Sequence, residues 1–190
     1  MQRSLTNTNS EILSVAERLL RTRGYNGFSF GDIADSIGTT RANIHYYYRT
    51  KEDLGCALIE VTRTQVLELF DSCRSEAAVE QLKQYFGIFE RSIDGELICL
   101  CGMLMAEDDA LPTSVRRANG ELVDLQLEWL EKVLEAGRQA GELSFDGPCS
   151  EQADDIFAFV HGRHIVSKFR RKPDSFSVAA DKLLMKLSVG

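Results

Sequence analysis

The sequence predicts an all-α protein. Apolar residues recur three or four positions apart along nearly every long segment, which is the spacing of an α-helix with one buried face. No segment alternates apolar and polar residues as a half-buried strand does. Glycine and proline fall between the periodic segments, where helices end or begin. These three observations favour a fold built of helices.

The composition is that of a globular protein without a membrane span. The 190 residues suffice for one or two domains, and 44% of them are hydrophobic and 27% charged. No apolar run approaches the roughly 20 residues that cross a bilayer, and the polar first ten residues lack a signal-peptide core. The five cysteines are irregularly spaced, unlike a secreted disulfide framework. We therefore expect a cytoplasmic protein with reduced thiols and no membrane partner.

The first expected element is a helix that ends at Gly24. Asn9 or Ser10 can cap its start, and a glycine readily takes the left-handed conformation that closes a helix. This helix packs on the two short helices that follow. Its apolar stripe is formed by Ile12, Leu13, Ala16, Leu19 and Leu20.

Two short helices separated by a tight turn come next. Ile33 and Ile37 lie four positions apart on the first, and the small side chain of Ala34 lets a second helix cross closely. Gly38 supplies the turn, because glycine has no Cβ to oppose a change of chain direction. This spacing is that of a helix-turn-helix, whose second helix can enter the major groove of DNA.

The second short helix would present a polar face. Thr39 or Thr40 can cap it through a hydroxyl, and Ile44 with Tyr47 or Tyr48 packs it on the first helix. The residues left facing outward are Arg41, Asn43, His45 and Tyr46.

The charge distribution supports a DNA-binding role for this region. The chain has a net charge of −7 and should repel DNA as a whole. Residues 36–51 nevertheless contain no Asp or Glu, whereas Arg41, Arg49, Lys51 and His45 all lie there. Because cations are concentrated where phosphates would be met, we predict that this segment binds DNA.

The rest of the chain is expected to be a longer series of helices. Thr50 followed by Asp53 is a capping-box-like start for a long helix that should connect two domains. Further apolar-rich helical segments are expected at residues 79–89, 98–110, 115–140, 153–169 and 176–187.

A set of apolar, small and capping residues in the first third of the chain carries a family resemblance. The set comprises Ile12, Ala16, Leu19, Gly24, Ser29, Ile33, Ala34, Gly38, Ile44, Tyr47, Tyr48, Lys51 and Leu54. With these residues the chain resembles the tetracycline-repressor (TetR/AcrR) family of transcriptional regulators. Two positions depart from the family pattern. Thr39 stands where an apolar residue is usual, and His45 stands where a tyrosine facing the DNA backbone is common.

The resemblance implies two domains. Residues 1–50 would form a three-helix, helix-turn-helix DNA-binding domain, and residues 51–190 a helical effector-binding and dimerisation domain. It also implies a homodimer whose last two helices form a four-helix bundle between subunits. The partners would be a palindromic double-stranded DNA operator and a small-molecule effector that relieves repression. No cofactor is implied.

The expected DNA contacts divide into two kinds. Arg41 and Asn43 lie near the start of the second short helix, where base edges are reached most easily. Phosphate contacts, which fix register without reading sequence, are expected from Thr40, His45, Tyr46 and Lys51. Tyr47 and Tyr48 are interpreted as packing residues, and packing is also the alternative for Tyr46.

The carboxy-terminal part offers weaker signals. Gly162 lies inside an apolar-rich helix, which favours the close approach of another helix at a dimer interface. His161 and His164 lack the ligand spacing of a recognised zinc site, so no metal is expected. Candidate effector-binding residues are Phe86, Phe89, Cys99, Met103, Trp129 and Phe157, and candidate interface residues are Phe157, His161, Gly162, Ile165, Leu183 and Leu187.

Two alternative functions remain open at this point. The first is a thiol-based redox or electrophile sensor that uses Cys99, since a cysteine near this position is reactive in some members of the resembling family. Cys101 would point away from Cys99 on a helix, so the two thiols would not form an easy disulfide. The second is a helical small-molecule-binding enzyme. No catalytic residue is expected, because the sequence shows no nucleophile with its base and no phosphate loop.

Overall fold

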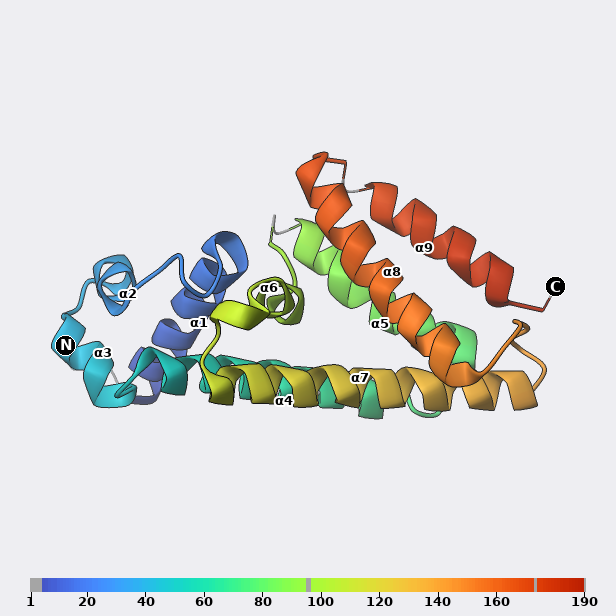
Figure 1. Ribbon diagram of the computed structural model, residues 1–190, viewed down its shortest axis with the longest axis horizontal. Helices are drawn as coiled ribbons and strands as arrows, with labels where there is room; N and C mark the ends of the chain where they lie inside the picture. Colours follow the sequence, from blue (N-terminus) through green and yellow to red (C-terminus); the bar gives the residue numbers. More distant parts are fainter. Residues whose placement is uncertain (1–4, 95–96, 173, 190) are drawn as a thin grey trace. The chain divides into compact units, whose positions relative to one another are not determined.

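The computed structural model describes residues 5–94, 97–172 and 174–189 (Figure 1). Its regular structure is helical, and the only pairing of β type in the described residues is an isolated bridge between Leu143 and Ser188. The prediction of an all-α fold is therefore confirmed. In chain order the elements are α1 (Leu5–Arg23), α2 (Phe30–Ile37), α3 (Arg41–Tyr47), α4 (Lys51–Ser72), α5 (Ala78–Asp94), α6 (Leu100–Ala106), the 3-10 helix η1 (Asp108–Ala110), α7 (Thr113–Gln139), α8 (Cys149–Phe169) and α9 (Asp174–Leu187).

The chain divides into two compact units. The first unit consists of Met1–Arg63 and Leu100–Glu121, and the second of Thr64–Cys99 and Leu122–Gly190. Helices α4 and α7 each contribute residues to both units. Parts of α4 and α7 and the whole of α6 therefore belong to the same unit as α1, α2 and α3. The functional boundary after residue 50 stays a prediction.

The first unit is organised around the interior side chains of α1, α2 and α3. Helix α2 packs against both α1 and α3, and α1 also packs against α6. Ile12, Ile33 and Ile44, one from each helix, have no exposed surface. Burying such a side chain stabilises the fold by about 1.5–3 kcal/mol relative to leaving it in water. This shared core fixes the helix-turn-helix.

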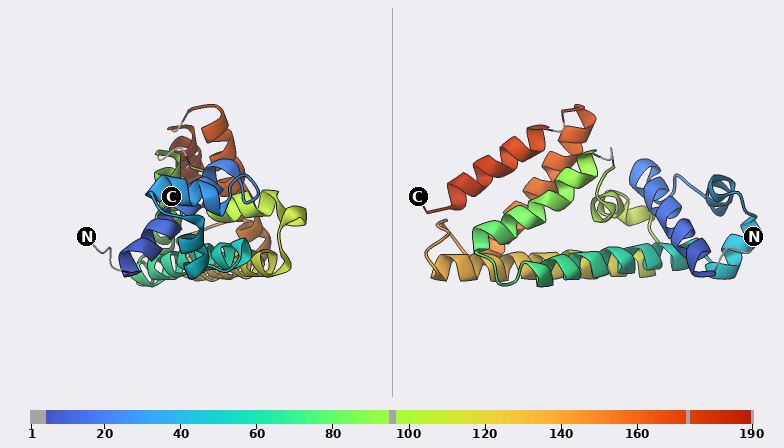
Figure 2. Two further views of the ribbon diagram at one scale, coloured as in Figure 1. Left: turned by 90° about the vertical axis from the view of Figure 1, so that its left-hand side faces the viewer. Right: turned by 180° about the vertical axis from the view of Figure 1, so that it is seen from behind.

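The second unit has an aromatic core. Helices α5, α8 and α9 pack on one another, as the reverse view also shows (Figure 2). The ring of Phe89 lies at the centre, with ring centroids 5.1 Å from His161 and 6.0 Å from Phe176. Tyr85 is also fully buried, and its hydroxyl donates to Gln126 Oε1 at 3.3 Å. Within the part of the chain that the structure describes, none of the helices combines the length and apolar character that a bilayer crossing requires.

Candidate DNA-binding site

Helix α2 begins at a reciprocal cap. The hydroxyl of Ser29 accepts from the amide of Asp32 at 3.4 Å, and the Asp32 carboxylate accepts from the Ser29 amide at 2.8 Å. The amides of Ser29 and Asp32, which lack a carbonyl partner within the helix, thus each have a side-chain acceptor. The Ser29 hydroxyl also donates to Asp32, and this bond is the main reason why the pKa of that carboxyl is lowered. The cap fixes where α2 starts.

The turn between α2 and α3 is made by glycine and threonine, as predicted. Gly38 ends α2 in the left-handed region, with φ of 67°, and the next amide donates to the Ala34 carbonyl at 2.9 Å. Thr40, and not Thr39, is the N-cap of α3, because its hydroxyl accepts from the Asn43 amide at 3.2 Å. The Thr39 hydroxyl instead accepts from Asn43 Nδ2 at 2.9 Å. The turn therefore orients the Asn43 side chain as well as the helix.

The inner face of α3 anchors it to the unit. Ile44 is completely buried, and the Tyr48 ring is buried with its hydroxyl donating to Asn9 Oδ1 on α1 at 2.9 Å. Tyr47 is half-buried, with its ring 5.4 Å from that of Tyr46. These positions agree with the interpretation of Tyr47 and Tyr48 as packing residues.

The outer face of α3 carries the predicted contact residues. Arg41 and His45 are exposed, Asn43 is half-buried, and 73% of Tyr46 is accessible to solvent. The Arg41 guanidinium lies close to the backbone of α2, since a Cβ placed on Gly31 would come within 3.1 Å of its Nε. The structure thus leaves a guanidinium, an imidazole and a phenol of α3 exposed to solvent and the Asn43 amide partly exposed.

His45 is held in a defined orientation. Its Nδ1 lies 3.1 Å from the Arg49 carbonyl oxygen, to which it donates when protonated, and its ring packs edge-on against Phe30 at 4.8 Å. Nε2 is the ring nitrogen that remains for the predicted phosphate contact. The orientation is thus compatible with the predicted phosphate contact.

Lys51 lies differently from the other predicted contact residues. Its ammonium donates to the Phe28 carbonyl and lies over two rings, 4.3 Å from the centroid of Phe28 and 4.9 Å from that of Tyr25. Burial lowers the pKa of Lys51. This cation already has a backbone acceptor inside the first unit, and its predicted contact with DNA phosphate stays a prediction.

The predicted effector-binding residues are divided between the two units, and their role stays a prediction. Phe86, Phe89 and Phe157 are buried in the core of the second unit, whereas Met103 belongs to α6 in the first unit. Cys99 is half-buried, and its amide donates to His164 Nδ1 at 3.4 Å. Among the described residues, no group of three His, Cys, Asp or Glu side chains is placed to hold a metal ion.

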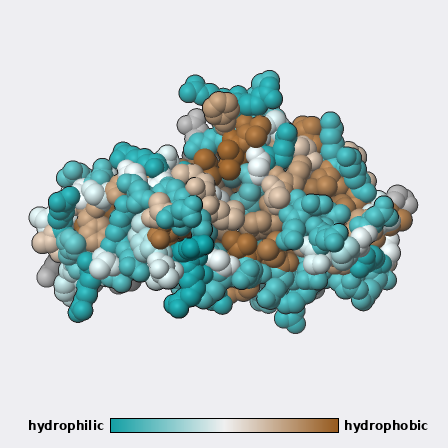
Figure 3. Space-filling view, viewed as in Figure 1, coloured by the Kyte–Doolittle hydropathy of each residue, from teal (hydrophilic) through white to brown (hydrophobic). Residues whose placement is uncertain are grey.

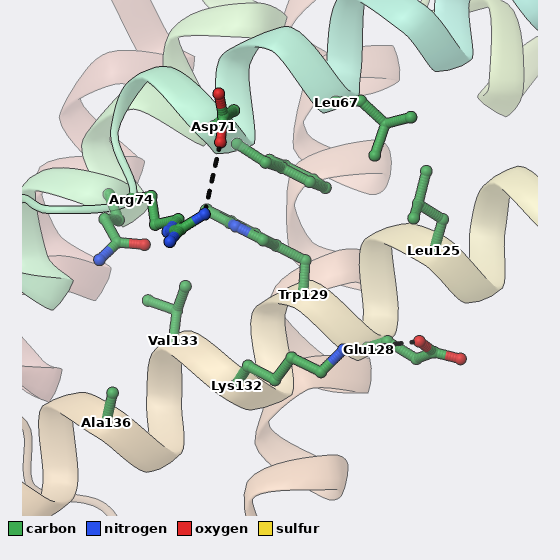
Figure 4. Close-up of a pocket in the computed structure, with 11 residues that line it drawn as sticks. Leu67, Asp71, Arg74, Leu125, Glu128, Trp129, Lys132, Val133 and Ala136 are labelled. Atoms are coloured by element: carbon green, nitrogen blue, oxygen red, sulfur yellow. Dashed lines mark ion pairs between the residues drawn. The ribbon is translucent and has the colours of Figure 1, made fainter.

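Trp129 lines an open groove of about 480 Å³ between α4 and α7 (Figure 4). Its ring stacks on Phe70, with centroids 4.0 Å apart and planes 2° apart. Asp71 with Arg74, and Glu128 with Lys132, form ion pairs at the edge of the groove. Sequence reasoning missed Phe70 as a groove residue, because it reads as one more member of the apolar stripe of α4.

The predicted interface residues differ in their exposure, and their role stays a prediction. Phe157, His161 and Leu187 are buried within the second unit, Leu183 is half-buried, and Gly162 and Ile165 are exposed. An exposed apolar surface lies on α8 and α9, and part of it is visible as brown areas (Figure 3). We call the following residues the α8–α9 apolar surface: Ile165, Val166, Phe169, Val178 and Met185. Phe169 is 86% exposed, which helical spacing alone could not indicate.

Comparison with known proteins agrees with this geometry. The family model for bacterial regulatory proteins of the tetR family matches residues 12–57. Transcriptional regulator AcuR of Cereibacter sphaeroides is 26% identical over 165 residues, covering 82% of this chain and 74% of that protein. HTH-type transcriptional repressor NemR of Escherichia coli K12 is 25% identical over 170 residues, covering 86% of this chain and 85% of that protein.

Solved structures show the same fold over nearly the whole chain. A TetR family transcriptional regulator from Agrobacterium tumefaciens aligns with a TM-score of 0.91 and 27% identity, covering 97% of this chain and 99% of that one. The reduced form of E. coli NemR aligns with a TM-score of 0.80 and 21% identity, covering 97% and 98%. These relatives are regulators and not enzymes. With the capped helix-turn-helix and the shared all-α fold, they show that the chain belongs to the TetR family of transcriptional regulators.

Proposed function

We propose that this regulator is a repressor that binds a palindromic operator as a homodimer and leaves it when a small-molecule effector binds. The observation that carries the proposal is the outer face of α3. Helix α3 is capped by Thr40 and anchored by the buried Ile44. It leaves Arg41 and Tyr46 exposed and Asn43 partly exposed in a stretch of chain without acidic residues. Arg41 can pair with guanine and Asn43 with adenine in the major groove.

A homodimer is supported by two features. Helix α3 has only 7 residues, and one short reading helix gives too few base contacts for a specific site. The α8–α9 apolar surface exposes side chains that a second copy could cover, and Gly162 on α8 has open space around it. Two copies related by a two-fold axis would place two α3 helices on two half-sites of a palindrome.

An effector site in the second unit is supported by the groove at Trp129. The NemR relative carries the name repressor, and a chain from Saccharomonospora viridis with this fold was solved in complex with choline. The name of NemR supports repression, and the choline complex supports the binding of a small molecule. An effector that binds one arrangement of the dimer better than another can change the DNA affinity by at most that difference in binding free energy.

The decisive experiment is a selection of random duplexes by the purified protein in a gel-shift assay. The proposal expects an enriched palindrome, a complex with two chains per duplex, and release by at least one member of a metabolite panel. Enrichment of no sequence over a salt titration would contradict it.

A thiol sensor is the second candidate. Cys99 is half-buried while Cys101 is buried, and a homologous fold was solved in a form described as reduced. A mild electrophile should lower the DNA affinity of the wild type and of Cys101→Ser but not of Cys99→Ser. Equal loss in all three proteins, or no loss in any of them, would favour the reversible ligand.

A further inference from the structure

The turn between α1 and α2 is held from outside the helix-turn-helix. Glu107 directly follows α6, and its carboxylate reaches this turn within the first unit. Oε1 accepts from the Tyr25 amide at 2.9 Å, while Oε2 accepts from the Asn26 amide at 3.2 Å and from Asn26 Nδ2 at 3.1 Å. One carboxylate thus satisfies two successive backbone donors of a turn, and bonds to a charged acceptor are about twice as strong as neutral ones.

Gly24 provides the space for this contact. It ends α1 with φ of 84°, and a Cβ at this position would lie only 1.9 Å from Glu107 Oε1. Glycine thus meets two requirements at position 24, because it adopts a positive φ without strain and has no Cβ to block the Glu107 carboxylate.

Lys51 holds the other end of the same turn. Its ammonium donates to the Phe28 carbonyl, and the negative charge of Glu107 opposes the lowering of the Lys51 pKa by burial. An acidic side chain therefore binds the donors of residues 25–26, and a basic side chain binds the acceptor of residue 28. We call Glu107, Lys51 and residues 24–28 the turn clamp.

The turn clamp lies immediately before the Ser29 cap, in the connection that leads from α1 to α2 and α3. Its two charged members come from α4 and from the residue after α6, outside the three helices that form the motif. We propose that Glu107 is a positioning residue for DNA recognition, which sets operator affinity through the turn clamp without touching DNA. The inference rests on the proposed DNA-binding function.

The test compares Glu107→Gln with Asp109→Asn in the full chain. Both variants remove one negative charge, and Asp109 is an exposed residue two positions further on. Amide exchange at Tyr25 and Asn26 measures the clamp itself, and titration with the selected palindrome at several salt concentrations measures its effect on affinity. Circular dichroism checks that each variant keeps its helix content.

We expect about tenfold faster exchange at both amides and about tenfold weaker DNA binding in Glu107→Gln, with unchanged base preference and salt slope. Asp109→Asn should stay within about twofold of wild type, as for a surface charge. Lys51→Met should likewise speed exchange at both amides, because it releases the other end of the turn, and only exchange is compared for this variant, since Lys51 is itself a predicted phosphate contact.

Two results would overturn the inference. The first is unchanged amide exchange in Glu107→Gln, which would mean that the carboxylate does not hold the turn. The second is faster exchange with DNA affinity equal to that of Asp109→Asn, which would leave the clamp without a role in recognition. A wild type that binds no duplex would instead contradict the proposed function, and exchange would still report on the clamp.

Discussion

Replacement of Gly24 by alanine should cost the first unit more stability than the same replacement at Gly38. Both glycines have positive φ, 84° at Gly24 and 67° at Gly38, so alanine pays the left-handed penalty at either site. That penalty is about 1 kcal/mol. A Cβ at Gly38 meets no atom within 4 Å, whereas a Cβ at Gly24 lies 1.9 Å from Glu107 Oε1 and must displace the carboxylate.

The displacement removes charge-assisted hydrogen bonds to the Tyr25 and Asn26 amides. Such bonds contribute about 1.5–3 kcal/mol when shielded, and we expect about 1–2 kcal/mol here because Asn26 is exposed. Gly24→Ala should therefore destabilise by about 2–3 kcal/mol and Gly38→Ala by about 1 kcal/mol.

Native-state amide exchange in increasing urea, followed at Ile33 and Ile44, measures the free energy of opening of the first unit. Both residues are completely buried, so their amides exchange through the opening of the shared core. Gly38→Ala is the matched control, because it lies in the same unit and changes the same group. Losses that agree within about 0.5 kcal/mol would refute the reasoning, since the carboxylate would then contribute nothing beyond backbone strain.

Three further predictions concern the reading helix, the interface and the cap. Arg41→Ala should lower operator affinity by about 1–3 kcal/mol and relax preference at one base pair of each half-site, as measured by binding to single-substituted duplexes. Uniform weakening of all duplexes would instead make Arg41 a phosphate contact. Phe169→Asp, a change at the most exposed apolar side chain of α8, should shift the protein towards monomer in analytical ultracentrifugation. An unchanged dimer would place the interface elsewhere. Because hydrogen bonds from Ser29 lower the pKa of Asp32, the carboxylate stabilises the fold above its ordinary pKa of 3.8 and loses this effect as pH falls through the lowered value. Between about pH 5 and about pH 2 wild type should thus lose more unfolding free energy than Asp32→Asn, and parallel pH curves would contradict the cap.

The helix-turn-helix could be predicted from sequence because its determinants are local. Gly38 and Ile44 lie within a few positions of the contacts that they make, so spacing alone indicated both the turn and the buried face. The choice between Thr39 and Thr40 as the cap could not be made, since either hydroxyl is within reach of a first-turn amide. Only the three-dimensional arrangement assigns Thr40 to the cap and Thr39 to the Asn43 side chain.

The remaining site residues depend on contacts between distant parts of the chain. Glu107 binds an amide 82 positions earlier, and no local pattern distinguishes it from Asp108 and Asp109. The phosphate role predicted for Lys51 followed from its place in a basic stretch. The spacing of residues in the sequence could not reveal that its ammonium donates a hydrogen bond to the Phe28 carbonyl. Helical periodicity likewise marks a residue as apolar without saying whether its own chain or another one covers it.

The stacked pair in the α4–α7 groove gives this protein an intrinsic optical reporter. Trp129 is the single tryptophan of the chain, and it lies on Phe70 in the second unit. Since indole emission responds to its immediate surroundings, the tryptophan emission of the unlabelled protein, excited where tyrosine does not absorb, reports on this groove. Quenching by a small molecule would show that its binding alters the surroundings of Trp129. A change on addition of operator DNA, which α3 contacts in the proposed function, would show that occupation of the reading helix alters the effector unit.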